Sequence, residues 1–254
     1  MPGAVVVTAA QGTFPGLVEA LRALSATVEE VPLLSFAPPP DWGPVDAALS
    51  EMGKYEAVVF TSPRSARAFS ERAAAAGRSP GSSPAGGRAA PAVWAAGAGT
   101  ARALGETFGP VRLPDERLAG ERGAASALVS ALTAAGIRGP VLFPCGDLRR
   151  DELPDRLRER GVAVEEVVCY RSVLATEDAA RRAAARAQVL VVASPSVAGL
   201  LARACSPGSR PVLVAVGPTT ADAARAHGWP PARVAPSPTA EALTAEVRAL
   251  LAAR

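Results

Sequence analysis

The chain has 254 residues, of which 49% are hydrophobic and 20% charged, and this composition excludes an intrinsically disordered protein. A formal net charge of +3, with no run of basic residues, argues against nucleic acid as a partner. The apolar runs are too interrupted for a membrane span or a secretion signal, so we expect no membrane partner and a cytoplasmic location.

Short apolar runs with β-branched residues predict buried strands, and apolar residues spaced three or four apart predict helices. The predicted strands are 4–8, 27–31, 57–61, 92–97, 111–113, 141–144, 164–170, 189–193, 212–216 and 233–235. The predicted helices are 15–24, 45–52, 63–76, 99–108, 123–135, 148–160, 176–186, 197–204, 219–227 and 239–252. This regular alternation predicts parallel sheets flanked by helices.

Two segments are predicted to be irregular. Residues 32–44 contain three consecutive prolines, which break regular structure, and this segment is expected to be a connector. Residues 77–91 are rich in glycine, serine and proline and predict a surface loop, to which we assign no function.

The sequence repeats itself, which bears on its domain organisation. Residues 5–31 resemble residues 141–167 at a constant offset. In a second repeat, Ser62 corresponds to Ser194 and Gly97 to Gly217. Two tandem domains divided near residue 136 would explain the repeats. The alternative is one discontinuous domain with the other inserted into it, and the proline-rich connector favours this arrangement.

Small polar residues follow several predicted strands. In open parallel sheets, ligands bind beyond the carboxyl ends of the strands, where helix N-termini supply free N–H groups. Hydroxyls and N–H groups there suit a ligand with several carboxylates or phosphates. The alternative is that these residues only cap helices, as Ser62 would before Pro63. The residues concerned are Ser62, Thr100, Ser194, Ser196, Thr219 and Thr220.

Residues that commonly bind metals or act as nucleophiles are sparse. Cys145, Cys169 and Cys205 form no CxxC pair, so we expect a reduced protein with no metal site. His227, the only histidine, precedes Gly228 at a predicted helix end, where capping is the simpler role. The sequence also lacks a complete nucleotide-binding motif and a GxSxG motif.

Tyr170 is the best candidate for chemistry. It is predicted to end a valine-rich strand, and a neutral phenol can donate a proton to a departing hydroxyl. The alternative is an amphipathic residue at a strand end. Among the arginines, Arg64 follows Ser62 and Pro63 directly and is our candidate for contact with a ligand carboxylate.

Five segments in this order resemble the uroporphyrinogen-III synthase family: FTSPRS (60–65), AGAGTARAL (96–104), FPCGDLRRDELPDRLRERGVAVEEVVCYRSV (143–173), ASPS (193–196) and AVGPTTADA (215–223). The resemblance implies an α/β protein of two similar domains, each a five-stranded parallel sheet flanked by helices. A two-stranded connector would join them, with the active cleft between them. The expected boundaries are a discontinuous domain of residues 1–34 and 174–254, an inserted domain of residues 39–169, and connectors at 35–38 and 170–173.

The resemblance also implies an activity. The family cyclises hydroxymethylbilane, a linear tetrapyrrole, to uroporphyrinogen III in haem biosynthesis. Water is lost, and ring D is inverted through a spiro intermediate. This would make the protein a cyclising hydro-lyase that uses no cofactor or metal, with Tyr170 assisting departure of the hydroxyl.

By the same resemblance, Ser62, Thr100, Ser194 and Thr220 match positions that line the family's cleft. The residue types alone also fit a non-catalytic, two-lobed module that binds a polycarboxylate ligand. A nucleotide-sugar transferase would need a stronger phosphate-binding motif. We expect the protein to be a monomer.

Overall fold

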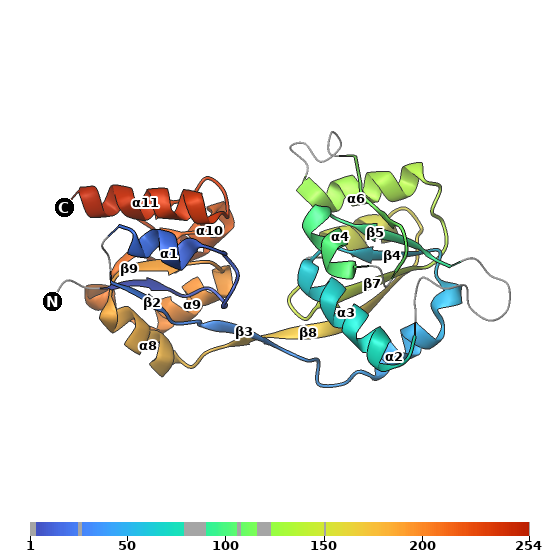
Figure 1. Ribbon diagram of the computed structural model, residues 1–254, viewed down its shortest axis with the longest axis horizontal. Helices are drawn as coiled ribbons and strands as arrows, with labels where there is room; N and C mark the ends of the chain where they lie inside the picture. Colours follow the sequence, from blue (N-terminus) through green and yellow to red (C-terminus); the bar gives the residue numbers. More distant parts are fainter. Residues whose placement is uncertain are drawn as a thin grey trace. The chain divides into compact units, whose positions relative to one another are not determined.

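The computed structural model describes residues 4–24, 27–78, 90–105, 108–115, 123–149 and 151–253. Most of the predicted loop at 77–91 therefore lies outside the described residues. The chain divides into two units: unit 1 comprises Met1–Ser35 and Val173–Arg254, and unit 2 comprises Phe36–Ser172 (Figure 1). Each unit is an α/β structure with its own sheet, which confirms the predicted fold class.

Unit 1 contains a five-stranded sheet in the order β11-β10-β9-β1-β2, in which every neighbouring pair is parallel. Its strands are β1 (Ala4–Val7), β2 (Val28–Glu30), β9 (Ala187–Val192), β10 (Val212–Ala215) and β11 (Arg233–Val234). Its helices are α1 (Leu17–Arg22), α8 (Glu177–Arg186), α9 (Pro195–Ala204), α10 (Pro218–Ala226) and α11 (Ala240–Ala252), with a 3-10 turn, η2 (Pro207–Ser209).

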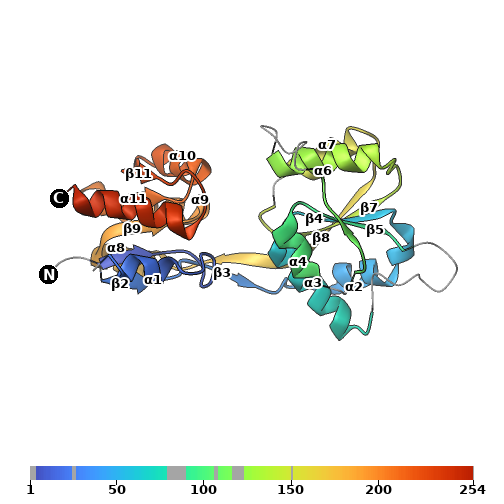
Figure 2. The same cartoon turned by 45° about the horizontal axis from the view of Figure 1, so that its top comes forward.

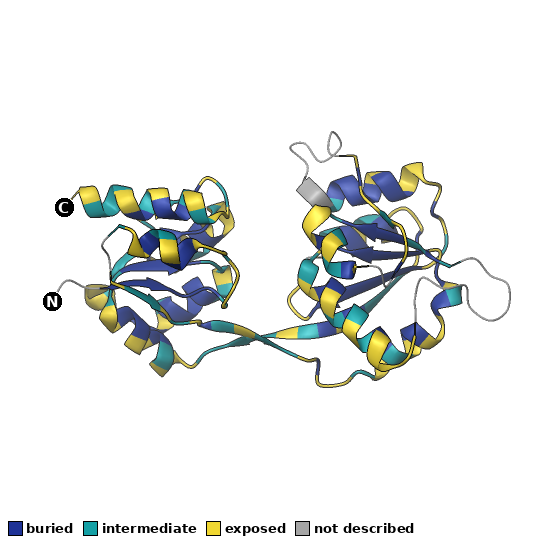
Figure 3. Cartoon of the chain, in the orientation of Figure 1, coloured by how far each residue is buried: buried dark blue, intermediate teal, exposed yellow. Residues whose placement is uncertain are grey.

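Alternating residues of these strands face two separate hydrophobic cores. Val5 and Val7 pack with helices α1 and α11, whereas Ala4 and Val6 pack with α8, α9 and α10. Strands covered on both faces are expected to be apolar throughout, which explains why the valine-rich runs predicted them so well. The central strands β1, β9 and β10 are accordingly mostly buried, whereas the edge strands β2 and β11 are partly exposed (Figure 3).

Unit 2 contains a sheet in the order β3-β8-β7-β4-β5-β6. The strands are β3 (Leu34–Ala37), β4 (Ala57–Phe60), β5 (Ala92–Ala95), β6 (Val111–Arg112), β7 (Val141–Gly146) and β8 (Val164–Leu174). Strands β8, β7, β4, β5 and β6 form parallel pairs. The expected sheet had five strands, whereas this one has six, because β3 joins it at the edge beside β8.

Helices cover both faces of this sheet. Helices α2 (Gly43–Ser50), α3 (Pro63–Ala75) and α4 (Ala98–Leu104) pack on one core, together with the 3-10 turn η1 (Met52–Lys54). Within that core the rings of Phe60, Phe69 and Phe108 contact one another, with centroids 5.6–5.9 Å apart. Helices α6 (Gly123–Ala134) and α7 (Glu152–Arg158) pack side by side on the other core (Figure 2).

The structure differs from the sequence prediction in three segments. Residues 32–44 are not wholly irregular, because they contain β3 and the start of α2. The helix predicted at 148–160 begins only at Glu152. Strand β8 continues past Tyr170 to Leu174, so Tyr170 lies within a strand and does not end it. The two differences that involve strands, at 32–44 and at Tyr170, occur where β3 and β8 run from one unit to the other.

None of the helices in the described part of the chain is long and apolar enough to cross a membrane.

Candidate functional site

The junction between β4 and α3 forms as the sequence predicts. The backbone N–H of Ser65 donates to Ser62 Oγ at 3.1 Å, and Pro63 occupies the first helical turn. The two serine hydroxyls also lie 3.0 Å apart. Ser62 is therefore a helix cap, and its hydroxyl is already partly engaged by α3.

The other predicted binding residues divide between the units. Thr100 lies in α4 of unit 2 and is buried. In unit 1, Ser194 precedes α9 but makes no side-chain cap hydrogen bond, and Ser196 lies in the first turn. Thr219 is exposed at the start of α10, whereas Thr220 is buried. These unit 1 residues lie at the carboxyl ends of β9 and β10, which are neighbours in the sheet.

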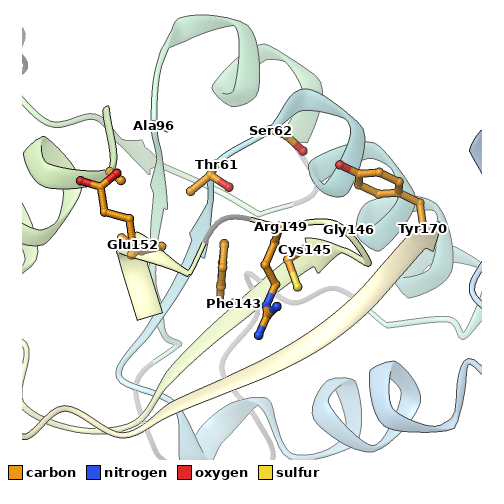
Figure 4. A pocket seen from close by; sticks show the side chains of 11 residues that line it. Thr61, Ser62, Ala96, Phe143, Cys145, Gly146, Arg149, Glu152 and Tyr170 are labelled. Atoms are coloured by element: carbon orange, nitrogen blue, oxygen red, sulfur yellow. The ribbon is translucent and has the colours of Figure 1, made fainter. Parts of the chain in front are cut away.

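A cavity of about 310 Å³ opens at the carboxyl ends of β4, β5 and β7 in unit 2 (Figure 4). It brings together two of the predicted residues, Ser62 and Tyr170, but not Arg64 or Thr100. Thr61, at the same strand end as Ser62, also lines it, whereas Arg149 and Glu152 are charged residues that the sequence pattern did not predict there. The full lining is Thr61, Ser62, Ala96, Ala125, Phe143, Cys145, Gly146, Arg149, Glu152, Leu153 and Tyr170.

Tyr170 is held by a local irregularity between β7 and β8. The register shifts between Cys145 and Gly146, so that Gly146 lies opposite Tyr170. The N–H of Asp147 then donates to the Tyr170 carbonyl at 3.1 Å, and the Asp147 carboxylate accepts from Ser172 N at 2.8 Å. The loop after β7 is thus bonded to β8 at Tyr170 and again at Ser172.

The phenol ring lies directly over Gly146. A Cβ atom added at Gly146 would lie 2.5 Å from Tyr170 Cζ and 2.7 Å from both Cε2 and Oη. No residue with a side chain fits there unless the ring moves. In Figure 4 the ring extends from β8 and its hydroxyl points toward Ser62.

The other side of the Tyr170 ring faces Phe36 and Arg64. The rings of Tyr170 and Phe36 meet edge to face, with centroids 5.7 Å apart. The Arg64 guanidinium lies over the Phe36 ring, 3.4 Å from its centroid, and 5.9 Å from that of Tyr170. Burial lowers the pKa of Arg64, although the Tyr170 phenol opposes this effect. No carboxylate among the described residues pairs with Arg64, so it is available to an anionic ligand.

Two charged residues of the cavity, Arg149 and Glu152, differ in how closely their charges are paired with other residues. Arg149 donates through Nε to the Glu166 carboxylate, which also accepts from Arg158 at 2.6 Å. The hydrogen bond from Arg149, aided by Arg158, holds the pKa of Glu166 below its usual value. Glu152 has a looser partner, Arg156, whose Nη2 lies 3.3 Å away.

Cys145 is a poor nucleophile on physical grounds. Its side chain is buried in the wall of the cavity, and burial raises the pKa of its thiol to about 12. A thiol reacts as its thiolate, so Cys145 is inert near neutral pH. Within the described part of the chain, no group of three histidine, cysteine or acidic residues could hold a metal ion.

Comparisons with known proteins agree on one family. Residues 16–245 match the family model described as Uroporphyrinogen-III synthase HemD. A uroporphyrinogen-III synthase from Synechococcus elongatus is 27% identical over 170 residues, which cover 66% of this chain and 60% of that protein. The match thus spans less than two thirds of that relative's length.

Two solved structures share the fold along its whole length. A mutant uroporphyrinogen III synthase from the extreme thermophile Thermus thermophilus has a TM-score of 0.67 and 19% identity, with 99% of this chain and 100% of that chain covered. A uroporphyrinogen-III synthetase from Helicobacter pylori has a TM-score of 0.62 and 17% identity, with the same coverage. At these identities the similarity shows a common two-domain α/β fold.

Proposed function

Because this chain belongs to the uroporphyrinogen-III synthase family, we propose that it cyclises hydroxymethylbilane to uroporphyrinogen III. The reaction loses water and inverts ring D, so the protein would be a cyclising hydro-lyase of tetrapyrrole synthesis. The observation that carries this proposal is the family match over residues 16–245. The placement of the Tyr170 phenol in a cavity at the strand ends supports it.

The first chemical step is departure of the substrate's hydroxyl group. Hydroxide is a poor leaving group, and a proton donor at its oxygen converts it to water. We assign this proton to the Tyr170 hydroxyl, which can donate it and points into the cavity (Figure 4). The bonding electrons leave with the oxygen, and the positive charge on the carbon is shared with the pyrrole nitrogen.

The second step is attack on that cation by the carbon of ring D that already carries a methylene bridge, which forms the spiro intermediate. The bond from that carbon to its old bridge then breaks, and the bridge becomes a second cation shared with the neighbouring pyrrole nitrogen. The unsubstituted carbon of ring D bonds to this bridge, which inverts the ring, and the proton lost from that carbon restores the phenol. Atoms and electrons balance without an external oxidant or reductant. Which carbon attacks depends on how the chain is folded, so much of the catalysis comes from positioning.

The substrate carries acetate and propionate groups, which need cationic or N–H partners. Arg64 is our first choice in unit 2, because its guanidinium lies beside Tyr170 without a carboxylate partner among the described residues. Ser62 and Thr100 in unit 2 are the other proposed contacts there. The proposed contacts in unit 1 are Ser194, Ser196, Thr219 and Thr220, which lie at strand ends beside helix N-termini.

The test is to supply the protein with freshly generated hydroxymethylbilane and separate the isomers of the oxidised product. We expect the type III isomer to predominate. Formation of the symmetrical type I isomer alone, as in spontaneous closure, would refute the proposal. Substrate binding together with that result would indicate the alternative, a non-catalytic module for polycarboxylate ligands.

A further inference from the structure

We propose that the cavity of unit 2 receives a single pyrrole ring of the substrate, the one that bears the departing hydroxyl. In this arrangement Glu152 contacts the N–H side of the ring and stabilises the cation formed when water leaves. Glu152 would thus be a second catalytic residue beside Tyr170. This inference rests on the proposed function and deepens it.

The size of the cavity limits its occupant. Sites for small ligands usually enclose about 300–1,000 Å³, and this cavity, at about 310 Å³, is at the lower limit. Four linked pyrrole rings with their side chains cannot fit in that volume. One ring with its substituents is the part of the substrate that fits.

The lining also suits one flat ring. Ala96, Ala125, Phe143 and Leu153 supply apolar walls, as expected for a pocket that holds an aromatic group. Among the polar groups, Glu152 and Tyr170 lie at opposite ends of the cavity, with Thr61 and Arg149 between them. In Figure 4 the Tyr170 hydroxyl lies at the Ser62 end, and the Glu152 carboxylate points toward Ala96.

The charge of Glu152 is the decisive feature. A carboxylate in a site for a polycarboxylate substrate repels the acetate and propionate groups. It attracts the pyrrole N–H, which can donate a hydrogen bond, and the cation that forms next to it. Glu152 therefore sets the orientation of the ring, with its side-chain carboxylates directed away.

Glu152 has the hydrogen-bonding capacity for this role. Its one partner among the described residues is Arg156, 3.3 Å away, and Arg156 also donates to Ser126 at 2.8 Å. The remaining lone pairs of the carboxylate are free to accept a pyrrole N–H. By contrast, the Arg149 guanidinium of the same cavity is already bound to Glu166.

The reaction step follows from this geometry. Tyr170 gives its proton to the hydroxyl oxygen, the carbon–oxygen bond breaks, and the electron pair leaves as part of water. The cation is delocalised onto the pyrrole nitrogen, whose N–H then donates to Glu152. A fixed negative charge at that point stabilises the product of the step more than the neutral ring, so it accelerates departure of water.

The variant Glu152→Gln keeps the shape of the side chain and its acceptor oxygen but removes the charge. We expect kcat for type III product to fall about ten- to a hundredfold, with KM nearly unchanged, because the charge acts on the cation. The matched control is Asp155→Asn on the same helix, which also loses an exposed ion pair, to Arg158. It should retain wild-type turnover. Unchanged kcat in Glu152→Gln, or an equal loss in the control, would overturn the inference.

A second measurement tests the contact without catalysis. Binding of 2-(hydroxymethyl)pyrrole and its N-methyl analogue can be compared by ligand-observed NMR. The wild type should prefer the N–H compound, Glu152→Gln should keep the preference, and Glu152→Ala should lose it. Equal binding of both compounds to the wild type would overturn the inference. If the wild type forms no type III isomer, the proposed function fails, and this binding result still decides the contact.

Discussion

Replacing Gly146 with alanine tests whether the position of the Tyr170 phenol matters for turnover. The φ angle of Gly146 is not positive, so the backbone itself tolerates a side chain. The whole effect then comes from the added methyl group, which would lie 2.5 Å from Tyr170 Cζ. Ordinary contacts of a Cβ atom lie at 3.4–4 Å, so the ring must move by about 1 Å.

Two magnitudes follow from that displacement. Overpacking of this kind costs about 1–3 kcal/mol in the free energy of unfolding. A misplacement of about 1 Å at a reacting group can lower the rate by about a hundredfold. We therefore expect Gly146→Ala to reduce kcat by about ten- to a hundredfold. The loss should not exceed that of Tyr170→Phe, since it acts only through the phenol.

The assay is the steady-state rate of type III isomer formation, with stability measured in parallel by urea unfolding. Gly208→Ala is the matched control, because a Cβ atom added there meets nothing within 4 Å. In the Tyr170→Phe background, Gly146→Ala should cause no further loss of kcat. Wild-type turnover in Gly146→Ala, or an equal loss in both backgrounds, would refute the reasoning.

Three further predictions concern single residues. Tyr170→Phe should lower kcat by about one to two powers of ten with little change in substrate binding, as measured by single-turnover and binding assays. An unchanged kcat would show that Tyr170 takes no part in the chemistry. Ser62→Ala should lower the free energy of unfolding by about 1 kcal/mol, and Ser194→Ala by clearly less. Of these two serines, Ser62 makes a side-chain cap hydrogen bond and Ser194 makes none. Equal losses of stability in urea unfolding would contradict this expectation. The pKa of Glu166 is lower in the folded protein than its unfolded value, near 4.5. Its ion pairs therefore stabilise the folded protein fully above the unfolded-state pKa. This stabilisation is lost as the pH falls through the lower, folded-state pKa. The stability difference between wild type and Glu166→Gln, measured by urea unfolding, should therefore shrink from pH 6 to pH 3, and a difference independent of pH would argue against it.

Local patterns explain the part of the fold that the sequence predicted. The apolar run at β4 and the Ser62-Pro63 step carry their structural information within a few residues, and both the strand and the cap are present. Local residue patterns did not predict strand β3, and only the family resemblance implied a two-stranded connector at 35–38 and 170–173. The stability of β3 comes from pairing with β8, far away in the chain, while nearby prolines suggested irregular structure. Local sequence says little about such pairing.

The candidate site was predicted only in part for a similar reason. Ser62 and Tyr170 were each predicted as site residues, but Glu152 was not. It lies in a predicted helix with several other charged residues, and the local pattern does not distinguish it from them. Its approach to the cavity depends on the order of strands β8, β7 and β4, which the sequence does not state. The requirement for glycine at position 146 is likewise visible only when Tyr170 is seen above it.

The three buried thiols give each unit a chemical reporter of its own unfolding. Cys145 and Cys169 lie in unit 2 and Cys205 in unit 1, all as free thiols, and burial raises the pKa of each. Cys169 and Cys205 belong to the hydrophobic cores, so an alkylating reagent can modify them only after the surrounding core opens, whereas Cys145 also lines the cavity. Alkylation rates at Cys205 and Cys169, read by mass spectrometry, therefore measure the opening of the two units separately within one intact chain.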